Sequence, residues 1–304
     1  MFSTRTLAGL AALMLAGAAA MPAAADGEEA VESAGSLLWQ PSMNVFRRFA
    51  VEPERMFEFY GGVLGLEQLQ TFDVGGGTNV ARFRAGNSEV KLTRRVPDRE
   101  YVPGRVDEAT GLRLLTFFYP ERDAVVERFR AHGLPEPSFE LVPGTNRLSA
   151  IVSDPDGHAV EIVVAPGAPA ELYATIEVGL TVSDLERSRE FYREFVGLEE
   201  LAPVDDPRFG TKKYSYRHGT TIVSLRSFDA DLPADTGTGG IQYVVTAVEP
   251  IDRLAKERGV TIDQPLSTLQ GFNLRTIWLD DPDGITNYFA ETGQSRRAAA
   301  QSSE

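Results

Sequence analysis

The residue types that most often carry chemistry are scarce in this chain. It has three histidines and no cysteine, which excludes thiolate catalysis, thiolate metal sites and disulfides. A Ser-His-Asp triad has no supporting signature, because the Gly-x-Ser-x-Gly pattern of a nucleophile elbow does not occur. The glycine run at 75–77 lacks the following Lys and helix of a phosphate-binding loop, so it is interpreted as a hairpin turn.

Each of the three histidines lies next to a glycine, in a place that favours a structural role. His132 is at the end of a predicted helix, where it would face the negative end of the helix dipole. His158 follows a tight turn and is expected to pack on it, with a ligand role at the rim of a site as the alternative. His218 lies in a predicted hairpin turn. None of the three is a leading candidate for metal binding or acid-base catalysis.

A duplicated pair of motifs organises the elements that must position any site. The tetrapeptide Asp-Pro-Asp-Gly occurs at 154–157 and at 281–284, each time between two short apolar runs. Pro presets φ for a type I turn and Gly accepts positive φ, so each motif predicts a strand, a tight turn and a second strand. A second pair of similar segments, 59–66 and 191–198, recurs in the same order. The two pairs indicate an internal duplication.

The hydrophobic pattern divides the chain into four βαβββ modules, which predicts an α+β fold. The modules are expected to pair into two cup-shaped domains, because a single module would leave one face of its sheet exposed. The predicted helices cover 53–63, 122–131, 184–195 and 250–258. The expected domains are 43–165 and 173–292, with a linker at 166–172 and a polar tail at 293–304.

The first 25 residues have the layout of a secretory signal peptide. Arg5 is the only charged residue among them, an Ala/Leu-rich run follows at 7–20, and three alanines precede Asp26. An uncleaved membrane anchor is the alternative, disfavoured because the run is short and rich in alanine. Residues 26–42 are interpreted as an acidic tether. We therefore expect a periplasmic or secreted protein that does not associate with membranes after cleavage.

The composition indicates an ordinary soluble protein that does not bind nucleic acid. With 304 residues, 42% of them hydrophobic, the chain is long enough for two domains. Its formal net charge of −14 makes the surface acidic, which argues against binding to nucleic acid. The sequence is also compatible with a homodimer.

With these features the chain resembles the vicinal oxygen chelate superfamily, which includes glyoxalases, bleomycin-resistance proteins and extradiol dioxygenases. The resemblance rests on the run 182–188 with Phe191 and Tyr192, the helix end at 130–133 and both Asp-Pro-Asp-Gly turns. It covers nearly all of the chain after the tether. Metal-dependent members of this family place a His on the first strand of a module and a Glu on the last strand. Such ligands hold a divalent metal that activates substrate oxygens.

Carried onto this sequence, most of the family's metal positions fall on residues that do not bind metal. In the first predicted domain the positions are Val45, Leu114, Lys91 and Glu161. In the second domain they are Glu177, Gly240 or Gln242, Ser224 and Tyr288. Each cup then has one carboxylate and no imidazole, so we expect no metal cofactor. A divalent metal remains the alternative, and Glu161 or Glu177 would then hold it.

The same positions supply the candidate site residues. Glu161, Glu177 and Tyr288 are the candidates for acid-base catalysis. Lys91 and Glu161 are expected to form an ion pair in the first cup or, alternatively, to face solvent. Arg47, together with Arg82 and Arg84, would make the first cup cationic, or else these arginines lie on the strand surface. The expected ligand-binding residues are Arg47, Lys91, Glu161, Glu177, Ser224, Gln242 and Tyr288.

We therefore expect an exported protein that binds a small molecule in one or both cups without using a metal. One alternative is a divalent-metal-dependent lyase, isomerase or dioxygenase of the glyoxalase or extradiol dioxygenase type, whose ligands lie one residue from the positions given above. Another is a structural or interaction protein whose cups are filled by side chains. An open cup without metal would support the binding protein, a bound divalent metal the enzyme, and a cup filled by side chains the structural or interaction protein.

Overall fold

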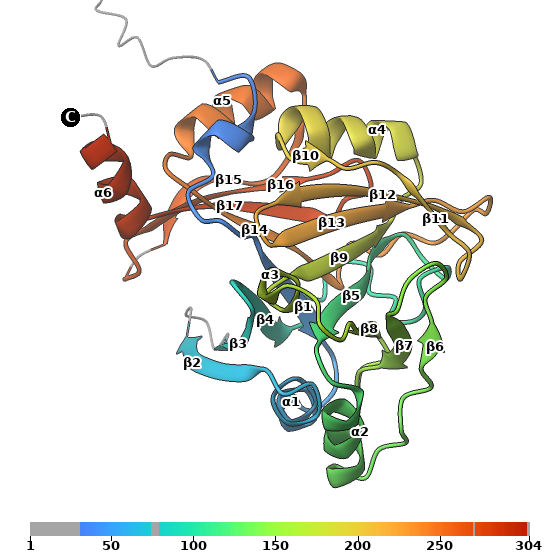
Figure 1. Ribbon diagram of the computed structural model, residues 1–304. Coiled ribbons are helices and arrows are strands. Elements are labelled where there is room, and N and C mark those ends of the chain that lie inside the picture. Colours follow the sequence, from blue (N-terminus) through green and yellow to red (C-terminus); the bar gives the residue numbers. More distant parts are fainter. Residues whose placement is uncertain (1–30, 74–78, 270, 303–304) are drawn as a thin grey trace, which may run out of the picture.

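The computed structural model describes residues 31–73, 79–269 and 271–302 (Figure 1). The predicted signal peptide and the glycine run at 75–77 lie outside the described residues. Within them, each of four modules begins with a strand, continues with a helix and ends with further strands. The predicted α+β class and the four modules are confirmed.

Modules 1 and 2 form the first half of the chain. Module 1 contains β1 (Asn44–Phe49), α1 (Pro53–Phe57) continued by η2 (Glu58–Val63), β2 (Glu67–Asp73), β3 (Asn79–Ala85) and β4 (Ser88–Arg94). Module 2 contains β5 (Gly111–Tyr119), α2 (Arg122–Ala131), β6 (Glu140–Leu141), β7 (Leu148–Ser153) and β8 (Ala159–Val164).

Modules 3 and 4 form the second half. Module 3 contains β9 (Ile176–Thr181), α4 (Leu185–Glu190) continued by η3 (Phe191–Phe195), β10 (Glu199–Glu200), β11 (Val204–Asp206), β12 (Thr211–His218) and β13 (Thr221–Arg226). Module 4 contains β14 (Gly239–Val245), α5 (Glu249–Arg258), β15 (Thr261–Leu269), β16 (Leu274–Asp280) and β17 (Thr286–Thr292). Three short helices lie outside the modules: η1 (Ala34–Leu37), α3 (Ala170–Tyr173) and α6 (Gly293–Ser302).

The modules build two sheets, and each sheet takes one module from each half of the chain. Sheet 1 has the order β15-β16-β17-β14-β1-β4-β3-β2, and sheet 2 has the order β10-β12-β13-β9-β5-β8-β7-β6. The joints are the antiparallel pairs β1 with β14 and β5 with β9. The sheets therefore do not follow the predicted domains 43–165 and 173–292. The first strand of each module has one edge whose backbone groups are unpaired within the module. That edge pairs with the first strand of a module in the other half of the chain.

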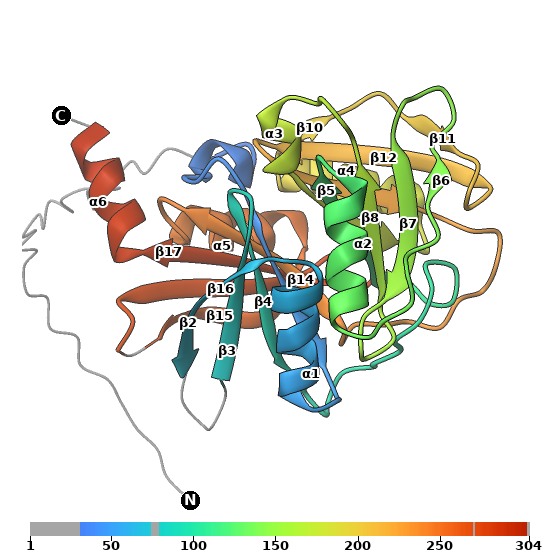
Figure 2. The same cartoon turned by 60° about the horizontal axis from the view of Figure 1, so that its bottom comes forward.

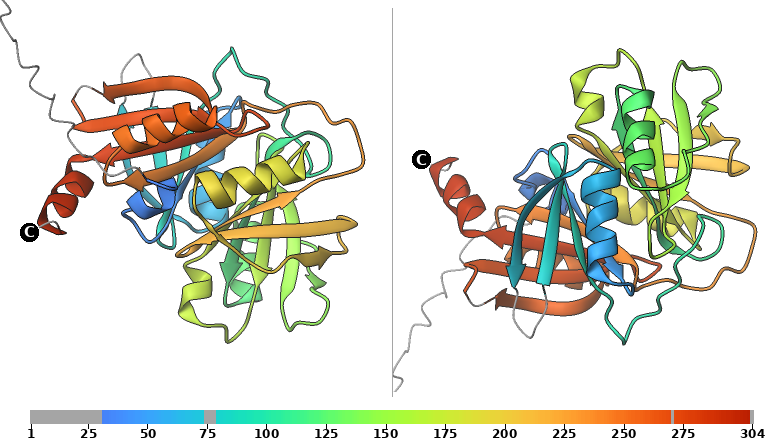
Figure 3. Two further views of the ribbon diagram at one scale, coloured as in Figure 1. Left: turned by 90° about the horizontal axis from the view of Figure 1, so that it is seen from above. Right: turned by 90° about the horizontal axis from the view of Figure 1, so that it is seen from below.

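One hydrophobic core contains residues of all four module helices and of both sheets. The helices α1 and α2 lie side by side (Figure 2), and η2 contacts α2. Seen from above, α5 covers the strands of module 4 and α4 lies over module 3 (Figure 3). One face of each sheet is therefore buried against helices. No helix within the described residues is long and apolar enough to cross a membrane.

Both Asp-Pro-Asp-Gly motifs form the predicted turns, one between β7 and β8 and one between β16 and β17. In each turn the first Asp is buried and accepts a hydrogen bond from a tyrosine of another module. The Tyr60 hydroxyl donates to Asp154 over 3.2 Å, and the Tyr192 hydroxyl donates to Asp281 over 2.9 Å. The duplicated turns thus join modules 1 and 2 and, in the same way, modules 3 and 4.

Two predictions about the ends of the fold need correction. Residues 34–39, assigned above to the acidic tether, pack against module 4: Trp39 N donates to Val244 O and Thr246 N donates to Leu37 O, both over 2.9 Å. They do so because the end of β14 leaves backbone groups free to pair. The segment predicted as a polar tail is helical as α6, and the Thr292 hydroxyl caps its start by accepting from Ser295 N over 2.9 Å.

Candidate functional site

Both sheets curl, so the face without helices is concave. In sheet 1 the rings of Phe72 on β2 and Phe272 after β15 lie 6.2 Å apart. These two strands are opposite edges of the sheet, and a flat sheet of eight strands would hold them about 34 Å apart. In sheet 2, Arg208 beyond β11 reaches across to Ser149 on β7, over 2.8 Å. We call these surfaces the concave faces of sheets 1 and 2.

The alternation of side chains along each strand decides which predicted residues reach the concave faces. On β4, Val90 and Leu92 enter the hydrophobic core, so Lys91 between them lies on the concave face of sheet 1. The same test places Gln242 and Tyr288 on the concave face of sheet 1. It places Glu161, Glu177 and Ser224 on the concave face of sheet 2.

Arg47 lies on the opposite face, so its prediction as a ligand-binding residue of the cup is wrong. It is fully buried, and its guanidinium lies 3.6 Å from the equally buried carboxylate of Asp154. Val45, on the same side of β1, is a core residue, and Phe46 takes the concave position that the sequence assigned to Val45. A slip of one residue in a strand moves every side chain to the other face.

The predicted ion pair between Lys91 and Glu161 is not formed, because the two residues belong to different sheets. Lys91 is on β4 of sheet 1 and Glu161 is on β8 of sheet 2. Glu161 instead pairs with Arg208 over 2.9 Å, and the carboxylate nearest to Lys91 is Glu89, at 3.7 Å. The pairing of modules across the two halves separates residues that the sequence placed in one cup.

Lys91 has a neutral hydrogen-bond partner on the concave face of sheet 1. Its ammonium donates to the amide oxygen of Gln242, while Arg82 binds both oxygens of Glu89, with Nε at 2.8 Å. Burial lowers the pKa of Lys91 to about 8. The nearby charge of Glu89 offsets part of this shift, and the charge of Arg82 adds to it. Lys91 is thus a cation whose nearest anion is held by another cation.

Next to Lys91, aromatic side chains form a wall on the same face. Phe46 lies beside Lys91 in the register of β1 and β4, and its ring is 6.3 Å from that of Trp278. Trp278 lies 4.8 Å from the ring of Tyr288, whose pKa is raised by burial. At Gly240 on β14, a Cβ atom would come within 2.5 Å of the Phe46 ring. A glycine is therefore needed for Phe46 to lie across this strand.

On the concave face of sheet 2, Glu177 is surrounded by cations. Lys213 Nζ lies 3.0 Å from one carboxylate oxygen, and Arg226 lies 3.9 Å from the same oxygen. Burial alone would raise the pKa of Glu177, but Lys213 and Arg226 outweigh it and hold the pKa below its usual value. Arg226 also pairs with Asp206 over 2.8 Å and donates to the Ser224 hydroxyl over 3.3 Å.

Glu161 and its surroundings fill the other half of this face. Besides Arg208, the carboxylate accepts hydrogen bonds from Thr116 over 2.9 Å and from Ser149 over 2.5 Å. Phe209, next to Arg208, and Phe228 pack against a small apolar cluster that includes Leu114. The concave face of sheet 2 is thus occupied by ion pairs and rings from its own loops.

The residues on these faces do not fit the divalent metal that the family resemblance implies. Among residues 31–73, 79–269 and 271–302, no three His, Asp or Glu side chains come together to hold an ion. On sheet 2 the carboxylates of Glu161 and Glu177 already contact cations, which would repel a metal at short range. On sheet 1 the corresponding positions hold the ammonium of Lys91, an amide and a phenol.

The three histidines lie in the structural settings predicted for them. His132 ends α2, with Nδ1 3.0 Å from Glu58 Oε1. His158 is buried, with Nε2 2.8 Å from the Tyr101 hydroxyl. His218 ends β12, with Nε2 2.6 Å from Gln40 O.

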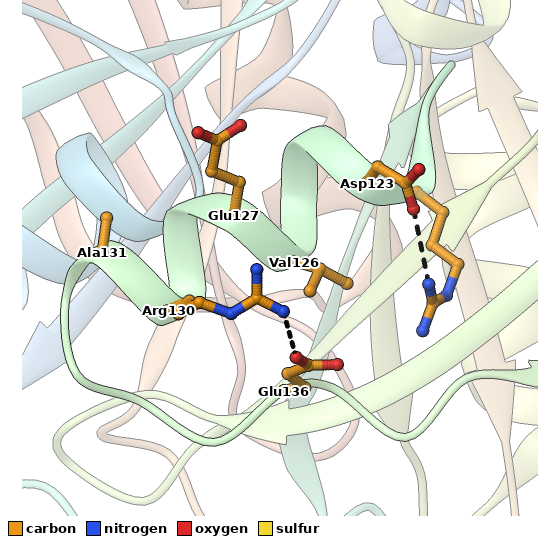
Figure 4. Close-up of a pocket in the computed structure, with 7 residues that line it drawn as sticks. Asp123, Val126, Glu127, Arg130, Ala131 and Glu136 are labelled. Carbon is orange, nitrogen blue, oxygen red and sulfur yellow. Dashed lines mark hydrogen bonds and ion pairs between the residues drawn. The ribbon is translucent and has the colours of Figure 1, made fainter.

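A hollow in the outer surface beside α2 is separate from both concave faces (Figure 4). Four of its charged residues form two ion pairs: Arg130 pairs with Glu136 over 2.5 Å, and Arg122 with Asp123 over 3.4 Å. None of the predicted site residues lines it. Its lining consists of Arg122, Asp123, Val126, Glu127, Arg130, Ala131 and Glu136.

The sequence analysis missed much of what surrounds the predicted residues. Lys213, Arg226 and Arg208 neutralise the carboxylates of sheet 2, yet their positions in the sequence carry no motif. Phe46 and Trp278 form the aromatic wall of sheet 1. Trp278 lies on a predicted strand, and its alternation with Ile277 and Leu279 was the one signal that pointed to the concave face.

Comparison with known proteins agrees with this architecture. The family model for the Glyoxalase/Bleomycin resistance protein/Dioxygenase superfamily matches residues 42–162 and 175–289. Lactoylglutathione lyase GLX1 of Arabidopsis thaliana is 25% identical over 250 residues, which cover 76% of this chain and 84% of that protein. Lactoylglutathione lyase of Oryza sativa subsp. japonica is 28% identical over 153 residues, or 47% and 52% of the two chains. The crystal structure of glyoxalase I from Zea mays, 22% identical, has a TM-score of 0.64 over 86% of this chain and 95% of that one.

Proposed function

Because the chain belongs to the Glyoxalase/Bleomycin resistance protein/Dioxygenase superfamily, we propose that it binds a small molecule on the concave face of sheet 1. The ligand is a compound with a flat apolar ring and a carboxylate or carbonyl oxygen. The ring packs on Trp278 and Tyr288, because Phe46 is buried and Arg48 lies over its ring. The oxygen accepts a hydrogen bond from Lys91.

One observation carries this proposal: Trp278 and Tyr288 stand on the same face as the cation of Lys91, and all three side chains remain partly exposed. Trp278, Tyr288 and Lys91 are half-buried, whereas the charged groups on the concave face of sheet 2 are paired with one another. A buried aromatic contact contributes about 1 kcal/mol beyond its area, and a hydrogen bond to a charged group about 1.5–3 kcal/mol. Together these two interactions give about 2.5–4 kcal/mol, which corresponds to binding in the millimolar range.

The two tryptophans of the chain allow a direct test. Trp39→Phe leaves Trp278, in the wall itself, as the sole fluorescent indole. In that background we expect benzoate to quench the fluorescence with saturation, and benzyl alcohol to do so more weakly. Lys91→Met should weaken benzoate binding about tenfold and leave benzyl alcohol nearly unchanged, because only the carboxylate gains a charged hydrogen bond.

Lys256→Met is the matched control, since Lys256 lies on the outer surface of α5 and pairs with Asp252. It should leave both titrations unchanged. Equal effects of the two substitutions on benzoate binding, or quenching that rises linearly without saturation, would count against the site.

The names of the relatives favour a second candidate, a lyase acting on lactoylglutathione. Such an enzyme would use the concave face of sheet 2, where Glu161 and Glu177 lie on either side of Thr116 in the strand register. Their ion pairs with Arg208 and Lys213 leave neither carboxylate free to hold a metal or to take a proton from a substrate. The binding function therefore has the stronger support. Export through the first 25 residues is part of the same proposal.

A further inference from the structure

Lys91 differs from the other three lysines of the chain in its position. Lys212 and Lys256 are largely exposed on the outer surface, and Lys213 is paired with Glu177. Lys91 lies on an inner strand of a curved sheet, with only 21% of its side chain exposed. Its neighbours in the strand register are Arg82 on β3 and Phe46 on β1.

The surroundings of Lys91 favour a neutral amine. Glu89 forms an ion pair with Lys91 at 3.7 Å and favours the ammonium, but Arg82 binds both oxygens of the same carboxylate. Desolvation of Lys91 outweighs Glu89, and the charge of Arg82 acts in the same direction as desolvation, so the pKa of Lys91 is lowered. The direct partner is the uncharged amide oxygen of Gln242. A lysine that is desolvated or placed next to a second cation is the kind that attacks carbonyl groups, because its amine loses its proton near neutral pH.

The size of the effect follows from the pKa of Lys91, which burial and Arg82 lower to about 8. At pH 7 about a tenth of such a lysine is neutral, against about 0.04% for a lysine with the ordinary pKa of about 10.4. The reactive form is therefore about 200-fold more abundant than at an exposed lysine.

We propose that Lys91 is a nucleophile that forms an imine with a small aldehyde or ketone held against Trp278 and Tyr288. This inference rests on the binding site proposed above and gives its ligand a chemical class, a carbonyl compound. The lysine nitrogen adds to the carbonyl carbon and forms a carbon–nitrogen bond. The nitrogen loses two of its three protons, and the carbonyl oxygen leaves with them as water. The product is a protonated imine, and nothing is oxidised or reduced.

Reductive trapping on the full chain tests the inference. The protein is incubated with benzaldehyde and sodium cyanoborohydride at pH 7, and peptide mass spectrometry locates the benzyl groups on its four lysines. We expect Lys91 to be labelled at least tenfold faster than Lys212 and Lys256. Labelling of Lys91 at the same rate as these two, or more slowly, would overturn the proposal. The comparison is made within the wild-type chain and does not depend on the folding of a variant.

Competition separates this inference from the binding proposal. Benzyl alcohol has the same ring and cannot form an imine, so it should slow the labelling of Lys91 and leave Lys256 unaffected. If benzyl alcohol quenches Trp278 while Lys91 is labelled no faster than Lys256, the binding proposal is supported and imine formation is refuted. If Lys91 is labelled rapidly but benzyl alcohol neither quenches Trp278 nor slows the labelling, imine formation is supported and the aromatic binding site is refuted.

Discussion

Asp154 and Asp281 offer a test in which one substitution, made at two equivalent places, should have opposite effects. Each is the first residue of an Asp-Pro-Asp-Gly turn, and each is buried and bonded to a tyrosine. Each also accepts two backbone N–H bonds from its own turn, at 2.9–3.0 Å. The two residues differ in their charged neighbours. Asp154 has the cation of Arg47 at 3.6 Å, whereas the charge that acts on Asp281 is the like charge of Asp283.

Asp154→Asn keeps the shape of the side chain and removes the counter-ion of Arg47. The Arg47 side chain is fully buried, and none of its three nitrogens has a hydrogen-bond partner within the described residues. Breaking a buried ion pair costs about 3–5 kcal/mol, because an uncompensated charge remains in the interior. We therefore expect Asp154→Asn to lower the free energy of unfolding by about 3 kcal/mol.

Asp281→Asn should be neutral in acid and stabilising in base. Burial raises the pKa of Asp281 from 3.8 to about 7, although the hydrogen bond from the backbone N–H of Ile285 acts to lower it. Between these two pH values the folded chain holds a proton that the unfolded chain has released, so the stability of the wild type falls as pH rises. The gap corresponds to about 4 kcal/mol at full ionisation, and Asn avoids that cost. The gain should be near zero at pH 4 and reach about 2–4 kcal/mol at pH 8.

Urea unfolding at pH 4, 6 and 8 measures both effects, with the midpoint and slope fitted for each variant. Asp123→Asn is the control, because this side chain is 97% exposed and its loss should change stability by less than about 0.5 kcal/mol. The reasoning would be refuted if Asp281→Asn were as destabilising as Asp154→Asn at pH 8, or if its effect did not vary with pH.

Two further predictions concern metal and export. Elemental analysis of the protein, purified without chelator or affinity metal, should find far less than one divalent ion per chain, because cations already contact Glu161 and Glu177. About one equivalent that disappears in Glu161→Ala or Glu177→Ala would support the lyase instead. Expressed in a bacterium, the chain should reach the periplasm and start near Asp26 by intact-mass analysis. An unprocessed, cell-associated chain would contradict the signal peptide.

The local turns and the duplication could be predicted from the sequence, but the pairing of the modules could not. Asp-Pro-Asp-Gly fixes a turn through the backbone limits of Pro and Gly, and these act over four residues. The joint between β1 and β14 is different, since its registered pair Asn44 and Gln242 is separated by 198 residues. A first strand can pair equally well within a half or across the halves, and no local preference decides between the two.

The candidate site was predictable where strands alternate between polar and apolar residues. Lys91 on β4 and Glu161 on β8 stand between apolar neighbours, a pattern that agrees with the concave-face alternative for both residues. On β1, the sequence Asn-Val-Phe-Arg-Arg-Phe is buried along its whole length, so no alternation of polarity marks its faces. The assignment there slipped by one residue and put Arg47 on the wrong side. Partners such as Arg208 come from loops, where periodicity gives no information.

The difference between the two concave faces follows from how their charges are compensated. On sheet 2 three carboxylates meet three cations, so every charge has a near partner: the pairs are Glu161 with Arg208, Glu177 with Lys213 and Asp206 with Arg226. On sheet 1, Lys91 and Arg82 share the single carboxylate of Glu89, which Arg82 binds through both oxygens and which lies 3.7 Å from Lys91. The hydrogen-bond partner of Lys91 is the amide of Gln242. A charged group that has lost its water and has few counter-charges is held at a desolvation cost in free energy. A hydrogen bond to a ligand oxygen, or conversion to an imine, reduces that cost. The duplicated fold thus provides two similar surfaces, and the charges of sheet 1 are less evenly compensated, which is the basis for the proposed reactivity of Lys91.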